Sequence, residues 1–211
     1  MLTAIVDYSS GNLHSARKAF EKISASNNLG SVVVTSNPDV ISSADRLVLP
    51  GDGAFPACKT ELLSSEAYDA MVYAAVEKGR PFLGICVGMQ LMAIKGYEYE
   101  ETDGLGWIDG EVCKIDLTDK NLKIPHMGWN TLNIENDHPI LKGILNGDHV
   151  YFVHSFQMVV SNRKQRLAYT DYGADITAVV GNGNLLGFQF HPEKSAKIGL
   201  KMIENFLSWS P

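Results

Sequence analysis

One cysteine stands between two glycines in the stretch Pro81 to Met92, which reads PFLGICVGMQLM. In the pattern Gly84-x-Cys86-x-Gly88, small residues two positions on either side of a nucleophile permit the sharp strand-to-helix turn that exposes its side chain. A thiol at a helix start lies where free N–H groups and the helix dipole favour the thiolate. An isolated free cysteine is most often a buried core residue, but this pattern predicts a nucleophile.

A base for this thiol is available in Phe188 to Glu193, which reads FQFHPE. His191 ends an apolar run and precedes Pro192, which biases it toward extended backbone at a strand end. Glu193 could orient the imidazole and stabilise its charged form, as the third member of a triad does. Because strand ends of a parallel sheet converge on one edge, Cys86 and His191 can meet. A lone His-Pro-Glu is most often a turn, but together the two motifs predict a Cys-His-Glu triad.

The chain contains two other cysteines, Cys58 and Cys113, in surroundings that suggest core or surface residues. Three widely spaced cysteines indicate neither a disulfide framework nor a zinc site. We therefore expect no metal and no cofactor, and a reducing compartment.

The elements that must position these motifs alternate between short apolar runs and helical patterns. Strands are predicted at Leu2 to Asp7, Ser31 to Thr35, Arg46 to Pro50 and Pro81 to Ile85, and helices at about Asn12 to Ser24 and Ala67 to Glu77. Continuous apolar strands alternating with helices indicate parallel pairing, because both faces of such a sheet are covered. We expect an α/β fold with a doubly wound, mostly parallel sheet and flanking helices.

From Trp107 onward the pattern is richer in β-strand segments. Turn signals occur at Gly110, Asn136-Asp137, Asn146-Gly147 and Gly181 to Asn184. They predict an added antiparallel β section, followed by a final helix at about Ser195 to Trp209. No repeat or linker is evident, so residues 1–211 are expected to form one domain.

The composition is that of an ordinary soluble globular protein, with 45% hydrophobic and 20% charged residues and a net charge of -6. The 18 Lys and Arg residues are spread along the chain, which argues against nucleic acid or an anionic membrane as a partner. The start MLTAIVDYSSGN lacks a basic region, and no segment approaches the roughly 18 apolar residues of a membrane span. A cytoplasmic location is expected.

The motifs GICVGMQ and HPE, with Pro50-Gly51-Asp52-Gly53 after the third predicted strand, resemble the class I glutamine amidotransferases. That family has a Cys-His-Glu triad on an α/β sheet. The resemblance implies that Cys86 attacks the side-chain amide of glutamine to give a γ-glutamyl thioester. His191 would protonate the departing ammonia and then activate water, while Glu193 holds its ring.

Three further segments are similar to the glutaminase subunits of imidazole glycerol phosphate synthases, namely Asp7 to Leu13 (DYSSGNL), Ile124 to Asn130 (IPHMGWN) and Tyr151 to Phe156 (YFVHSF). The resemblance thus covers nearly the whole chain. It implies a (β/α)₈-barrel synthase subunit as partner, which uses the ammonia to make imidazole glycerol phosphate for histidine biosynthesis. The residues that resemble the region facing this partner are Asn12, Trp129 and Asn130.

The resemblance also implies residues that surround the substrate. The residues similar to glutamine contacts are Gly53, Gln90, Ser155 and Glu98. The amides similar to an oxyanion hole are those of Val87, Asp52 and Gly53.

Asp52 departs from the family pattern, which usually has an apolar residue there. A carboxylate beside a developing oxyanion is unfavourable unless its side chain points away, whereas backbone N–H donation survives the change. The segment Ala93 to Tyr97 (AIKGY) is also less acidic than in the family, which bears on Glu98. His126 and His154 are expected to be packing or interface residues, as a histidine beside an apolar strand often is.

Two other classes of function stay open on the sequence alone. One is the glutaminase of another pathway, such as pyridoxal phosphate synthesis, or an uncoupled γ-glutamyl hydrolase; the segments IPHMGWN and DYSSGNL argue against it. The other is a non-catalytic binding module that kept the fold, which the presence of Cys86, His191 and Glu193 opposes.

Overall fold

The computed structural model describes residues 1–117 and 121–211. Within this part the largest sheet has eight strands, in the order β2-β1-β3-β4-β14-β13-β12-β9. The first five pair in parallel and the last three continue the sheet in antiparallel pairing. Their bounds are β1 Leu2–Val6, β2 Ser31–Thr35, β3 Arg46–Gly51, β4 Phe82–Cys86, β9 Asn133–Ile134, β12 Arg166–Asp171, β13 Asp175–Asn182 and β14 Leu185–Phe188. The predicted α/β fold is confirmed.

The central parallel strands are buried on both faces. Every residue of β3 and β4 is buried, and this double burial is why both strands are almost continuously apolar. The exception is Arg46, whose guanidinium donates hydrogen bonds to the carbonyl oxygens of Phe206 (3.4 Å) and Trp209 (2.8 Å). These carbonyls belong to the end of the last helix, where the helix dipole favours a cation.

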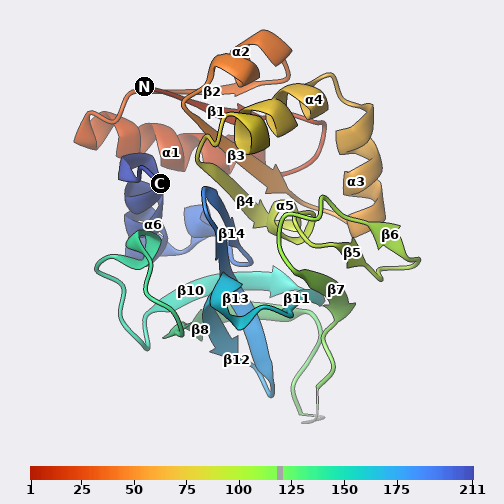
Figure 1. Cartoon of the computed structure of the whole chain (residues 1–211). Helices are drawn as coiled ribbons and strands as arrows, with labels where there is room; N and C mark the ends of the chain where they lie inside the picture. The colour runs from red at the N-terminus through yellow and green to blue at the C-terminus, as the bar shows by residue number, and fades with distance from the viewer. Residues whose placement is uncertain (118–120) are drawn as a thin grey trace.

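Helices cover both sides of the parallel strands (Figure 1). Helices α1 and α6 lie together on one side, where the rings of Phe20 and Phe206 pack edge to face with centroids 6.4 Å apart. Helices α3 and α4 lie on the other side. The bounds are α1 Leu13–Asn27, α2 Pro38–Ser43, α3 Phe55–Ser64, α4 Ala67–Val72, α5 Val87–Gln90 and α6 Ala196–Ser208. Across residues 1–117 and 121–211, no helix combines the length and apolarity needed to cross a membrane.

The helix expected over Ala67 to Glu77 changes character halfway along. It begins as α4 and continues as a π-helix over Tyr73–Glu77. Hydrophobic periodicity does not distinguish these two helix types, because both place apolar residues on one side over so short a span.

Two smaller sheets lie below the parallel strands in the view of Figure 1. One pairs β8 with β10, and the other has the order β11-β7-β5-β6. Their bounds are β5 Lys95–Gly96, β6 Thr102–Asp103, β7 Gly110–Lys114, β8 His126–Thr131, β10 His149–His154 and β11 Phe156–Val160, and the short 3-10 helices are η2 Pro139–Leu141, η3 Arg163–Gln165 and η4 Pro192–Lys194. The turn signal at residues 181–184 does join two antiparallel strands, β13 and β14.

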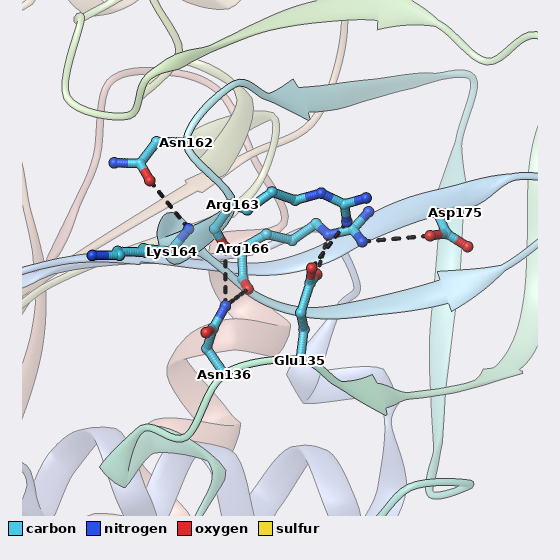
Figure 2. Close-up of polar contacts among 7 residues, drawn as sticks. All are labelled: Glu135, Asn136, Asn162, Arg163, Lys164, Arg166 and Asp175. Carbon is cyan, nitrogen blue, oxygen red and sulfur yellow. Dashed lines mark hydrogen bonds and ion pairs between the residues drawn. The ribbon is translucent and has the colours of Figure 1, made fainter.

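A buried arginine ties the antiparallel edge of the large sheet together (Figure 2). The side chain of Arg166 is 9% exposed and forms ion pairs with Glu135 and with Asp175, the latter at 3.4 Å. Arg163 reaches the other oxygen of Glu135 at 2.9 Å, and the Asn136 side chain donates to the carbonyl oxygens of both arginines. A buried charge needs such partners, so this cluster holds the β9 end and η3 against β12.

Close contact between two backbones shapes the turn from β4 into α5. A Cβ atom added at Gly88 would lie 1.9 Å from the carbonyl oxygen of Leu49 on β3, and one at Gly84 would lie 2.5 Å from the carbonyl oxygen of Gly88. A Cβ at Gly51 would lie 2.6 Å from the Gly88 nitrogen. The glycines predicted to permit a sharp turn therefore also let α5 rest directly on β3.

We expect Gly88→Ala to lower the free energy of unfolding by about 3 kcal/mol or more, because the methyl group would overlap backbone that cannot withdraw easily. Urea denaturation followed by circular dichroism measures this change.

Gly183→Ala is the matched control, since Gly183 has a φ of 58° but open space around it. It should cost only about 1 kcal/mol, the strain of a left-handed alanine. Equal stability losses in the two variants would contradict the steric account.

Candidate active site

Cys86 is the last residue of β4 and has a backbone that non-glycine residues rarely adopt, with φ 56° and ψ -114°. Such a conformation persists only where the surrounding structure enforces it, and here the packed turn at Gly88 does so. The helix that follows, α5, has only four residues. The dipole at Cys86 is therefore smaller than the sequence pattern suggested.

A cavity of about 150 Å³ opens beside Cys86. Every residue predicted to contact glutamine or to form the oxyanion hole lines this cavity, namely Asp52, Gly53, Val87, Gln90, Glu98 and Ser155. They come from the loop after β3, from α5, from the loop between β5 and β6, and from the junction of β10 and β11. The structure thus brings together residues from four separate parts of the chain.

His191 lies next to Cys86 and is held by Glu193. Its Nδ1 is 2.9 Å from Oε1 of Glu193, and its backbone N–H donates to the carbonyl oxygen of Tyr151 at 3.0 Å. Burial lowers the pKa of His191, but hydrogen bonds to Cys86 and Glu193 and their negative charges outweigh it and raise the pKa to about 10. Because Nδ1 forms the hydrogen bond to Glu193, the other ring nitrogen, Nε2, forms the hydrogen bond to Cys86. This is the arrangement of a cysteine nucleophile with a histidine base and an orienting carboxylate.

The backbone between Asp52 and Gly53 is fixed from behind by the loop that follows β1. Ser10 donates its hydroxyl to the carbonyl oxygen of Asp52 at 2.8 Å, and Ser10 Oγ lies 3.3 Å from the Cys58 sulfur. In a trans peptide the carbonyl and the next N–H point in opposite directions, so the Gly53 N–H points away from Ser10. The unexpected Asp52 is itself solvent exposed.

Two residues predicted to bind glutamine also make contacts within the protein. Glu98 Oε2 accepts the backbone N–H of Phe55 at 2.8 Å and so caps the start of α3, where Ala54 provides no side-chain cap. Gln90 Nε2 donates to the carbonyl oxygen of Phe156 and to Gln189, each at 3.0 Å. Its carbonyl oxygen is consequently the group that Gln90 can offer to a ligand.

Of the three residues predicted to face a partner, Asn12 and Trp129 lie near His191, whereas the Asn130 side chain contacts His126. Asn12 caps α1 by accepting the Ser15 N–H at 3.3 Å and lines the same small cavity as His191 and Glu193. Trp129 is 53% exposed on β8 and stands opposite Tyr151, whose carbonyl oxygen accepts the His191 N–H. Asn130 follows it on the same strand.

Three residues near the site were not predicted from the sequence, namely Ser10, His154 and Gln189. Gln189 lies inside FQFHPE and Ser10 inside DYSSGNL, so both motifs were visible, but nothing in residue type or spacing assigned either side chain a contact. His154 lines the cavity, although its sequence context indicated a packing or interface role. Three-dimensional neighbours were needed to identify all three.

Comparison with known proteins agrees with this site. The family model described as glutamine amidotransferase class-I matches residues 4–209. The imidazole glycerol phosphate synthase subunit HisH of Ruegeria pomeroyi is 62% identical over 212 residues, and that of Cereibacter sphaeroides is 55% identical over 212 residues, with all of each chain covered.

A crystal structure of a glutamine amidotransferase has the same fold, with a TM-score of 0.70 at 19% identity, covering 97% of this chain and 96% of the other. With a family model and full-length relatives in agreement, the chain belongs to the class I glutamine amidotransferase family, in the group of imidazole glycerol phosphate synthase HisH subunits.

Proposed function

We propose that residues 1–211 act as a single glutamine amidotransferase domain, which hydrolyses glutamine to glutamate and ammonia and passes the ammonia to a synthase subunit. The observation that carries this proposal is the contact of Cys86 with a His191–Glu193 pair at the wall of a small polar cavity. The family of the chain supplies the substrate class.

In the proposed reaction the Cys86 thiolate attacks the side-chain carbonyl carbon of glutamine. The oxyanion that forms accepts hydrogen bonds from the backbone N–H groups of Val87 and of the Asp52–Gly53 segment. The hydrogen bond from Ser10 to the Asp52 carbonyl oxygen supports this role, because it fixes the direction of the Gly53 N–H. The imidazolium of His191 then gives its proton to the departing nitrogen, so that ammonia leaves and a thioester remains.

Neutral His191 next accepts a proton from water, and the hydroxide attacks the thioester carbon. Glutamate leaves and the thiolate–imidazolium pair is restored. Glu193 keeps the ring oriented through both steps by accepting from Nδ1. The proposed contacts of glutamine are Gly53, Gln90 and Ser155 along the cavity and Glu98 for the amino group.

The proposed acceptor of ammonia is the (β/α)₈-barrel subunit of an imidazole glycerol phosphate synthase, which uses it in histidine biosynthesis. The relatives of the chain are named as a subunit of that synthase. The proposed interface contains Asn12, Trp129 and Asn130. The position of Asn12 and Trp129 near His191 supports it, because ammonia released there would have a short path to a partner docked on this face.

We expect Cys86→Ala to reduce glutamine hydrolysis by a factor of about 10⁴ or more, because the covalent step loses its nucleophile. A coupled assay of glutamate release measures the rate. Cys113→Ala is the control, since Cys113 lies on β7 outside the cavity lining and should keep full activity. Unchanged hydrolysis in Cys86→Ala would favour a non-catalytic binding module.

We expect Glu193→Gln to lower kcat by a factor of about 100, because the orienting carboxylate is lost. The raised pKa of His191 keeps its proton available up to about pH 10, so activity falls only as pH rises through that value. Without the Glu193 charge this pKa is lower, and the alkaline limb of the pH–rate profile should move to lower pH.

The conservative control for this profile is Glu204→Gln on α6, where the carboxylate pairs with Lys201 at 3.2 Å. Its profile should match that of the parent protein. An alkaline limb that stays in place in Glu193→Gln would argue against the assigned role of Glu193.

Adding a purified barrel subunit with its nucleotide ligand should raise glutamine turnover by about tenfold or more, in the usual range for coupling between sites. Trp129→Ala should weaken the complex by about 30-fold, as expected of a central interface tryptophan. The control is Val159→Ala, because Val159 is 52% exposed on β11, outside the proposed interface. Equal turnover with and without the barrel subunit would point to an uncoupled hydrolase or to another pathway.

A further inference from the structure

Gln189 lies just after β14 and two residues before His191, and its side chain is fully buried. Its Nε2 points to the Cys86 sulfur at 4.0 Å, while its Oε1 accepts from Gln90 Nε2 at 3.0 Å. Gln189 is absent from the cavity lining. It therefore contacts the proposed nucleophile from within the protein rather than from the substrate side.

The orientation of this amide follows from a neighbouring carbonyl group. The oxygen of Phe156 can only accept, so the Gln90 atom 3.0 Å away must be the nitrogen Nε2. That same nitrogen lies 3.0 Å from Gln189, so the Gln189 atom facing it must be an oxygen. The nitrogen of Gln189 is then left to face Cys86.

The Phe156 oxygen is held by a second donor on its other side. His154 Nδ1 lies 2.8 Å from it and must carry a hydrogen. Burial lowers the pKa of His154 to about 3 although its hydrogen bond to Phe156 acts in the opposite direction, and burial lowers the pKa of His126 to about 4. Both rings are therefore neutral at neutral pH.

Neutral rings with these contacts have only one arrangement of hydrogens. His154 Nε2 must accept from His126 Nδ1 at 3.0 Å, and His126 Nε2 must accept from Asn130 Nδ2 at 3.2 Å. Asn130 is itself oriented, because its Oδ1 accepts the Thr131 N–H at 2.8 Å and its Nδ2 donates to the Asp171 carbonyl oxygen at 2.9 Å. We call this series, from Asn130 through the two histidines, Phe156 O and the two glutamines to Cys86, the amide chain.

We infer that Gln189 is a positioning residue that donates an N–H to Cys86 and favours its thiolate, which rests on the proposed role of Cys86 as the nucleophile. A hydrogen bond to sulfur is weak for a neutral thiol and stronger once the sulfur is charged. Because α5 has only four residues, its dipole stabilises a charge at Cys86 weakly. The Gln189 N–H, which points at the sulfur, adds to this stabilisation. The Phe156 oxygen, acting through Gln90, prevents Gln189 from turning its oxygen toward the sulfur.

Other ionisable groups also act on this sulfur and must stay unchanged in a test. His191 bonds to Cys86, Glu193 lies behind it, and Cys58 interacts with the thiol electrostatically. The remaining ionisable residues of the cavity wall are Asp52, Glu98 and His154.

The test uses Gln189→Met, which keeps the length of the side chain and removes the donor. The rate of iodoacetamide alkylation at Cys86 is measured across pH by mass spectrometry of the peptide that contains it. Below the midpoint of the parent profile, the variant should react roughly tenfold more slowly, the loss expected for one hydrogen bond to a charged group. The two rates should converge at high pH, and glutamine kcat should fall while KM stays the same.

A second variant, Gln189→Asn, keeps the amide but shortens the side chain, so it should show the same displacement of the profile. Gln157→Met is the control, because Gln157 is also buried but takes no part in the amide chain. Thermal unfolding of each variant is used to check that it is folded.

An alkylation profile in Gln189→Met and Gln189→Asn that coincides with that of the parent would overturn the inference. Alkylation does not require glutamine, so the two proposals fail separately. A displaced profile in a protein that hydrolyses no glutamine would sink the proposed function and leave the role of Gln189 intact.

Discussion

The contact of the α5 backbone with β3 is the constraint on which the rest of the site depends. With no side chain at Gly88, the turn after Cys86 rests against Leu49, and this places Val87 beside the strand end that contains Gly51 and continues to Gly53. The parallel register then places β14 directly alongside β4, with Phe188 opposite Ile85. The residues after β14 consequently emerge next to Cys86, and His191 needs no long loop to reach the sulfur.

Features that depend on local sequence could be predicted. Burial on both faces makes a strand continuously apolar, so β1, β3 and β4 were recognisable within one or two residues. The edge strand β2 is only partly covered, but its run of three valines has high β propensity and was recognisable as well. The glycines around Cys86 record a steric requirement of the turn itself, and parallel strand ends meet at one edge whatever lies between them. These arguments suffice to bring Cys86 and His191 together and to identify the hairpin of β13 and β14.

Features that depend on distant partners could not be predicted. The bonds of Gln90 to Phe156 and Gln189 and of Gln189 to Cys86 span 66, 99 and 103 residues. A buried glutamine has no periodicity or spacing that reveals which atom its amide will meet. The same holds for Arg166, whose partners Glu135 and Asp175 lie on neighbouring segments. The short length of α5 was not predictable either, because the carbonyl oxygens of Leu91, Met92 and Ala93 accept N–H groups from residues 105–108 and not from a further helical turn.

The backbone of Cys86 sets a conflict between durability and chemistry. At φ 56°, every residue with a side chain is strained by about 1–3 kcal/mol, and only glycine is at ease. Glycine, which has no sulfur, is thus the residue with the least backbone strain at position 86. Glycine at position 86 would relieve this strain but could not react, so the reactive residue is held at a cost in stability.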